Sequence, residues 1–136
     1  MLKTSIIALA LMTGFTGSAW AEMASPTEPP KGSYQKVSKL VKLPSFLPGM
    51  GSLYVDPKTL PAGPFAAYGR DGKLVSTIYM IPMKDMQAKK KFSGLGVAGE
   101  KVSSVDFYYN AGHPGVSEPH YHVVLWHTDP QTAKVK

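Results

Sequence analysis

Residues 65–81 read FAAYGRDGKLVSTIYMI, and this stretch decides the fold that we expect. Two runs rich in β-branched and aromatic residues, Phe65 to Tyr68 and Lys73 to Ile81, flank the Gly-Arg-Asp-Gly sequence at 69–72. Such runs around an Asp-Gly turn are typical of a β-hairpin. Pro82 lacks the N–H that a strand ladder requires, so we expect the second strand to end there.

The rest of the chain predicts further strands and one short helix. Within the turn-rich segment 44–64, only 52–55 has an extended pattern, and residues 102–109 and 121–127 predict two more strands joined by a long loop. Residues 83–92 fit a short helix that ends in three lysines, where cations offset the helix dipole. Residues 37–43 suit a strand or a helix equally well. The predicted fold class is therefore α+β, with a small antiparallel sheet of hairpins and one short helix.

The N-terminus has the pattern of a cleavable export signal. Lys3 supplies the positive charge, residues 6–15 the apolar stretch, and Ala19 and Ala21 the small residues before a cut at Glu22. We therefore expect a signal peptide at 1–21 and a periplasmic or secreted protein. Small and polar residues interrupt the apolar stretch, which is too short for a membrane anchor of about 20 residues, so no membrane span is expected after cleavage.

Composition limits the organisation and the partners of the mature protein. Three prolines between residues 22 and 33 predict a flexible leader, followed by a single α+β domain at 34–130 and a tail at 131–136. Without Lys3, 14 basic and 9 acidic residues remain, and the lysines are spread along the chain. Export argues against nucleic acid as a partner, and an exposed strand edge leaves a homo-oligomer open.

Histidine is concentrated in one short stretch, and cysteine is absent from the chain. All four histidines lie in GHPGVSEPHYHVVLWH, residues 112–127. Without cysteine there is no disulfide and no thiolate ligand, so a metal ion would need histidine, methionine or oxygen donors. On a strand, side chains two residues apart point to the same face. His120 and His122 can therefore converge on one ion.

Further ligands are predicted on either side of this pair. Glu118 has the same parity as His120 and His122, and His113 lies on a proline-stiffened loop that can fold back. Imidazoles with one carboxylate suit divalent Zn, Cu, Fe or Mn. His127 falls on the opposite strand face, so we exclude it from the site. The alternative is that His120 and His122 pair with Asp106, Tyr108 or backbone carbonyls.

Three methionines form a second pattern with ligand chemistry. Met80, Met83 and Met86 follow M-x-x-M-x-x-M spacing, and thioethers are ligands for Cu(I). Pro82 separates the strand residue Met80 from the two helical methionines. Since methionine commonly fills irregular cores, we favour packing as their role.

The segments GHPGVSEPHYHVVLWH and YGRDGKLVSTIYMIP resemble a group of small exported bacterial domains of unknown function that share a terminal Glu/His-x-His strand. The resemblance covers residues 45–127 and implies a compact α+β domain with no known activity. The His-x-His strand is also similar to the cupin motif. However, no glutamate follows His122 and no second motif is present, so we do not expect a cupin barrel.

Our leading hypothesis is an exported domain that binds a divalent transition metal through His120 and His122, with Glu118 and His113 as further ligands, in a binding or sensing role. One alternative is a metal-dependent enzyme that uses the same site, with Tyr108, Tyr109 or Tyr121 as a proton donor. Another alternative is a metal-free interaction module whose histidines titrate near pH 6.5. Serine-hydrolase, P-loop and dinucleotide motifs are absent from the sequence.

Overall fold

The computed structural model describes residues 27–136 of the chain. The predicted signal peptide at 1–21 and the beginning of the predicted leader lie outside these described residues.

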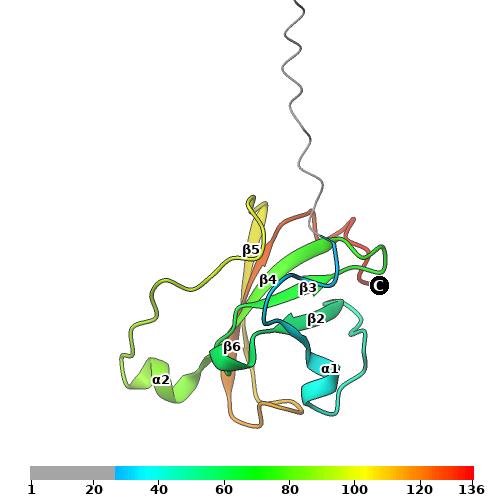
Figure 1. Cartoon of the computed structure of the whole chain (residues 1–136). Coiled ribbons are helices and arrows are strands. Elements are labelled where there is room, and N and C mark those ends of the chain that lie inside the picture. The colour runs from blue at the N-terminus through cyan, green and yellow to red at the C-terminus, as the bar shows by residue number, and fades with distance from the viewer. Residues whose placement is uncertain (1–26) are drawn as a thin grey trace, which may run out of the picture.

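Six strands form one antiparallel sheet in the order β1-β2-β3-β4-β6-β5 (Figure 1). Their bounds are β1 Gln35–Lys36, β2 Ser52–Val55, β3 Phe65–Tyr68, β4 Leu74–Pro82, β5 Ser104–Asn110 and β6 His120–Trp126. The predicted hairpin is confirmed, because Phe65 pairs with Ile78 and Ala67 with Ser76. The two predicted C-terminal strands are also confirmed as the antiparallel pair β5 and β6.

The helices are too short to form a layer of their own. The α1 helix spans Val37–Leu40, α2 spans Met83–Gln87, and a 3-10 turn spans Pro57–Thr59. None of the residues of α2 is buried, and the chain turns away at Lys89, whose φ is 57°. After Pro82, the segment has only two methionines before the lysine run. Two apolar residues make too narrow a stripe for a longer helix to pack on the sheet. The predicted α+β class is therefore wrong, and the fold is dominated by its sheet.

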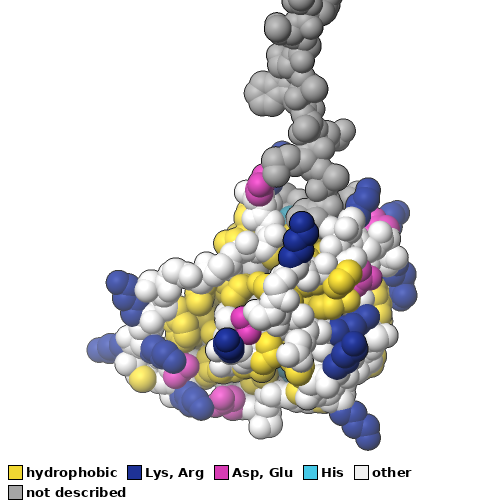
Figure 2. Space-filling view, viewed as in Figure 1, with side chains coloured by type: hydrophobic (Ala, Val, Ile, Leu, Met, Phe, Trp, Pro, Cys, Tyr) yellow, Lys and Arg dark blue, Asp and Glu magenta, His cyan; other side chains and the backbone are white. Residues whose placement is uncertain are grey.

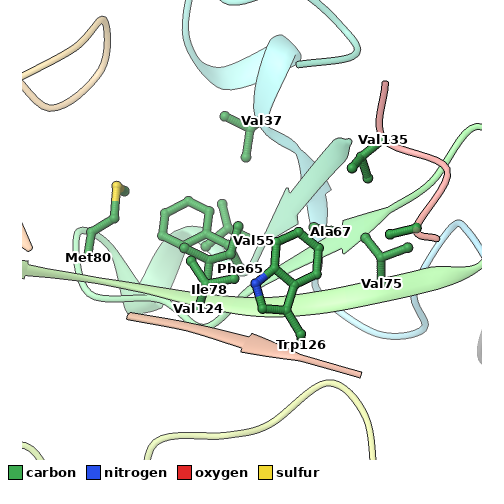
Figure 3. Close-up of a cluster of buried hydrophobic side chains, with 11 residues drawn as sticks. Val37, Val55, Phe65, Ala67, Val75, Ile78, Met80, Val124, Trp126 and Val135 are labelled. Atoms are coloured by element: carbon green, nitrogen blue, oxygen red, sulfur yellow. The ribbon is translucent and has the colours of Figure 1, made fainter. Parts of the chain in front are cut away.

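The main core lies on one face of the sheet. Antiparallel pairing places Val55, Phe65, Ile78 and Val124 side by side on this face, because each residue is opposite the next across the strands. All four are at most 4 % exposed. Figure 3 shows these side chains gathered on the strands, with Val37 of α1 and Val135 facing them from outside the sheet. The four-residue helix α1 and short irregular segments, rather than a layer of helices, thus cover the core.

The C-terminal segment is one of these covers. Val135 is 4 % exposed and Ala133 is 8 % exposed, although we expected residues 131–136 to form a tail. The carbonyl of Val135 accepts a hydrogen bond of 2.6 Å from the Gly49 N–H, and that of Lys134 accepts one of 2.8 Å from the Arg70 N–H. These bonds hold the segment against the loops that precede β2 and β4.

The opposite face of the sheet is covered over only part of its area. The Glu28 N–H donates to the Gly72 carbonyl in the turn between β3 and β4, and the Ala98 N–H donates to Thr77 Oγ1 of β4, so two irregular segments contact this part of the sheet. Farther along, Phe107 and Tyr109 on the edge strand β5 are 58 % and 54 % exposed. A homo-oligomer formed through this edge stays a prediction.

Charge and hydropathy add little to the choice of partner. In Figure 2 the Lys and Arg side chains are scattered around the visible face rather than gathered in one patch. Among residues 27–136, no helix has the length and apolar character needed to cross a membrane.

We predict that Val135→Ala lowers the free energy of unfolding by about 2 kcal/mol, because it removes two buried methyl groups and leaves a cavity. Val102→Ala is the control, since Val102 is 43 % exposed and also lies outside the strands. Its effect should stay within about 0.5 kcal/mol. Urea unfolding measures both variants, and equal effects would show that residues 131–136 do not pack on the core.

Candidate metal centre

Two histidines of β6 point into the interior from the core face of the sheet. Along β6, the buried residues alternate with partly buried ones, and His120 and His122 share the buried face with Val124 and Trp126. His120 is 0 % exposed and His122 is 2 % exposed. The strand parity predicted for this pair is therefore confirmed, and both imidazoles lie in a setting with little water.

The loop between β5 and β6 brings in a third histidine. His113 and Val116 exchange two backbone hydrogen bonds of 2.9 Å, which close a tight turn. Gly112 permits this turn, because its φ is +130° and a Cβ there would lie 2.5 Å from the Ser117 carbonyl oxygen. The turn directs the His113 ring back toward β6, as predicted for a loop that folds over the pair.

The three imidazoles meet at their Nε2 atoms. The Nε2 of His120 lies 2.9 Å from that of His122 and 3.2 Å from that of His113, and the third separation, between His113 and His122, is 3.4 Å. An ion 2.0–2.1 Å from three imidazole nitrogens needs them about 2.9–3.4 Å apart, from right-angled to tetrahedral geometry. The cluster could therefore hold a metal ion without rearrangement.

Hydrogen bonds at Nδ1 determine which nitrogen carries the proton in the rings of His120 and His113. The Nδ1 of His120 lies 2.7 Å from the Glu118 carbonyl oxygen, and the Nδ1 of His113 lies 3.0 Å from the Pro114 carbonyl oxygen. A carbonyl only accepts, so each Nδ1 must carry the proton. In their neutral forms, both rings therefore direct an Nε2 lone pair into the cluster.

The third ring has a partner that can donate or accept. Tyr108, opposite His122 on β5, places its Oη 3.1 Å from the His122 Nδ1. Burial raises the pKa of Tyr108, and the nearby Asp106 raises it further, so the phenol keeps its proton. Burial, with the neighbouring His120 and His113, lowers the pKa of His122 from 6.5 to about 4. His122 is thus neutral at pH 7, the form that binds a metal.

The structure does not bring the carboxylate of Glu118 into this cluster. Its Oε2 lies 2.9 Å from Lys84 Nζ at the surface, and only its backbone carbonyl serves the site, through His120. The parity argument required the strand to extend back through residue 118. However, β6 begins at His120, directly after Pro119, so the alternation of faces does not reach Glu118.

The remaining candidates from the sequence lie elsewhere. His127 bonds to Thr77 Oγ1 through Nε2 and to the Lys101 carbonyl through Nδ1, outside the cluster as predicted. Tyr109 and Tyr121 contact each other on the opposite sheet face, which leaves Tyr108 as the tyrosine at the site. Met80 is buried in the core, whereas Met86 is 42 % exposed.

A cavity beside the cluster was not predicted from the sequence. It has a volume of about 570 Å³, and His113 and His122 line part of its wall. Loops rich in proline and glycine, residues 41–50 and 113–116, form much of the remainder together with α1. The sequence signals wrapping loops here, but it gives no measure of how tightly they fill the space beneath them.

Comparison with known proteins places the chain in a family. No protein-family model matches the chain, and no curated protein matches it. Among solved structures, the crystal structure of hypothetical protein TTHB210 from Thermus thermophilus is 39 % identical, with a TM-score of 0.61. The match covers 79 % of this chain and 97 % of that one. The fold is thus that of a small sheet domain, and the chain belongs to the same family as TTHB210. The resemblance to exported domains of unknown function stays a prediction.

We predict that the metal-free protein loses stability as the pH falls from about 6.5 to 4. In this range the unfolded chain binds a proton at His122 that the folded chain does not, so the free energy of unfolding decreases as pH is lowered.

Urea unfolding at several pH values, in EDTA, measures this effect in the wild type and in His122→Gln. The variant should lose less stability over the same range, relative to its own value at pH 7.5. Parallel curves for the two proteins would contradict the lowered pKa of His122.

Proposed function

We propose that this protein binds a divalent transition metal ion through the Nε2 atoms of His113, His120 and His122, as a small exported binding or sensing domain. The export signal predicted at residues 1–21 supports a periplasmic or secreted location. The predicted ligand set is revised in one respect, because the Glu118 carboxylate, which pairs with Lys84, is left out.

One observation carries the proposal. The Nε2 atoms of His120 and His113 lie 3.2 Å apart, and in the neutral rings they direct lone pairs at each other, because a carbonyl accepts from the Nδ1 of each ring. Two neutral rings held in this way have no proton to share and repel each other. A cation between them removes the repulsion, and a metal ion can engage the third nitrogen, that of His122, as well. A single bridging proton would satisfy only one pair.

The outer contacts are those of a metal site. Metal-bound histidines usually donate their second N–H to a carbonyl or another acceptor, which sets the tautomer and orients the ring. The carbonyls of Glu118 and Pro114 have this role for two rings, and Tyr108 Oη can accept from the third. The contacts that we considered as an alternative to metal binding are thus compatible with it.

The donor set favours a late transition metal. Three imidazoles without a carboxylate suit Zn(II) and Cu(II) better than Mn(II), which prefers oxygen ligands. Neutral ligands leave the double charge of the ion uncompensated. Three protein ligands also leave at least one coordination position for water or another small ligand.

We predict that the metal-free wild type binds one Zn(II) ion and that His120→Ala/His122→Ala abolishes this binding. Isothermal titration and elemental analysis after dialysis measure the stoichiometry. Zinc should also raise the thermal midpoint of the wild type, because a ligand that binds only the folded state stabilises it.

His127→Ala is the matched control, since it removes a histidine of the same stretch whose ring lies outside the cluster. This variant should bind zinc as the wild type does. Circular dichroism establishes that each variant is folded. Equal zinc uptake by the wild type and the double variant would refute the proposed site.

We further predict that Tyr108→Phe weakens zinc binding about tenfold, the lower end of the effect of losing an outer-shell partner. The phenylalanine ring keeps the packing but removes the hydroxyl that contacts His122 Nδ1.

Tyr109→Phe is the control, because Tyr109 lies on the same strand but is 54 % exposed on the other face. Competition with a chromogenic zinc chelator measures both affinities. A Tyr108→Phe affinity equal to that of the control would show that the hydroxyl does not orient His122.

A further inference from the structure

The cavity next to the histidines is polar at one end and apolar elsewhere. Four polar side chains line it, those of Tyr108, Asn110, His113 and His122, and all four come from β5, β6 or the loop between these strands. Tyr108 pairs with His122, and Asn110 pairs with His120, so the polar side chains gather at one end of the β5–β6 pair. The wall formed by α1, β2 and residues 41–50 is apolar, with Leu40 among its residues.

The cavity lining contains no charged side chain. None of the Lys, Arg, Asp or Glu residues between 27 and 136 contributes to its wall. A ligand with an anionic group would therefore bury an unpaired charge, which is strongly unfavourable, unless a cation lies at the polar end. A metal ion held by the histidines would be that cation.

A metal ion held by the histidines would be accessible from this cavity. His113 and His122 line the wall, whereas His120 is fully buried behind them and does not. An exogenous ligand can thus approach the three nitrogens from the cavity side. The volume of about 570 Å³ falls within the roughly 300–1,000 Å³ that is typical of small-molecule sites.

We propose that the cavity binds an amphipathic monocarboxylate, whose carboxylate coordinates the histidine-bound metal and whose apolar chain lies against α1 and residues 41–50. The proposal rests on the metal binding proposed above. It names the class of ligand for the same site, namely a molecule with one anionic head and an uncharged apolar body such as a medium-chain fatty acid.

Binding of decanoate to the zinc-loaded protein tests this proposal, at concentrations below those that form micelles and without free zinc. We expect decanoate to bind the zinc-loaded protein at least about tenfold more tightly than the metal-free protein, because the apo cavity has no cation to pair with the head. In the series from acetate to decanoate, each added methylene should raise the affinity by about fourfold. Cobalt-loaded protein should change its visible spectrum when decanoate coordinates.

Two variants separate the apolar wall from the metal. Leu40→Asp places a charge in the apolar wall at a residue that is 37 % exposed, so folding should tolerate it. It should weaken decanoate binding about tenfold and leave zinc affinity within twofold of the wild type. Val102→Asp, at a residue that is 43 % exposed and does not line the cavity, should change neither affinity.

The outcomes distinguish the two proposals. Zinc binding without decanoate binding, or with decanoate binding that is equal in the presence and absence of zinc, would overturn the ligand proposal and leave the metal site standing. Decanoate binding to a protein that takes up no zinc would overturn both, as measured by the zinc titration itself. A flat response to chain length would show that the cavity does not hold the chain.

Discussion

The antiparallel pairing of β6 with its two neighbours is the interaction on which the site and the core both depend. Seven residue pairs join β6 to β4, and seven join it to β5. Because strand residues alternate between faces, this register places His120 and His122 on the same face as Val124 and Trp126. A shift by one residue would move all four side chains to the other face. Burial of Val124 and Trp126 in the core thus fixes the sheet face on which His120 and His122 lie.

Bringing three imidazoles so close together, with His120 and His122 buried, works against the stability of the metal-free fold. The rings of His120 and His113 face each other through lone pairs, and His122 is kept neutral by burial and by its neighbours. Core packing by nonpolar residues at these positions would avoid that cost. Polar groups that oppose local stability are common at functional sites, where the rest of the fold compensates for them. Here the compensation comes from the β6 pairings and from the turn around Gly112.

The sequence sufficed for features that depend on short-range patterns. The hairpin at 65–81 follows from β-forming runs around a Gly-rich turn, and the convergence of His120 and His122 follows from strand parity. It failed where a boundary or a long-range contact decides the outcome. Glu118 was assigned by extending the parity of β6 past Pro119, and the tail at 131–136 was assigned because its contacts with residues 49 and 70 leave no local signal. The predicted α+β class overestimated the helical content for a related reason. The helix propensity of residues 83–92 does not show whether the fold provides a surface against which a helix can pack.

The same lack of a helical layer explains why there is room beside the histidine cluster. Sheet faces in larger domains are covered by helices, whose regular ridges pack closely against the strands. Here the short helix α1 and irregular segments cover the core face, and residues 41–50 and 113–116, which contain prolines and glycines, line a cavity instead of filling the space above the strands. The result is a mostly apolar cavity with the histidine cluster at one end. The register of the sheet therefore positions two of the three clustered histidines, and the loops determine the size of the adjoining cavity.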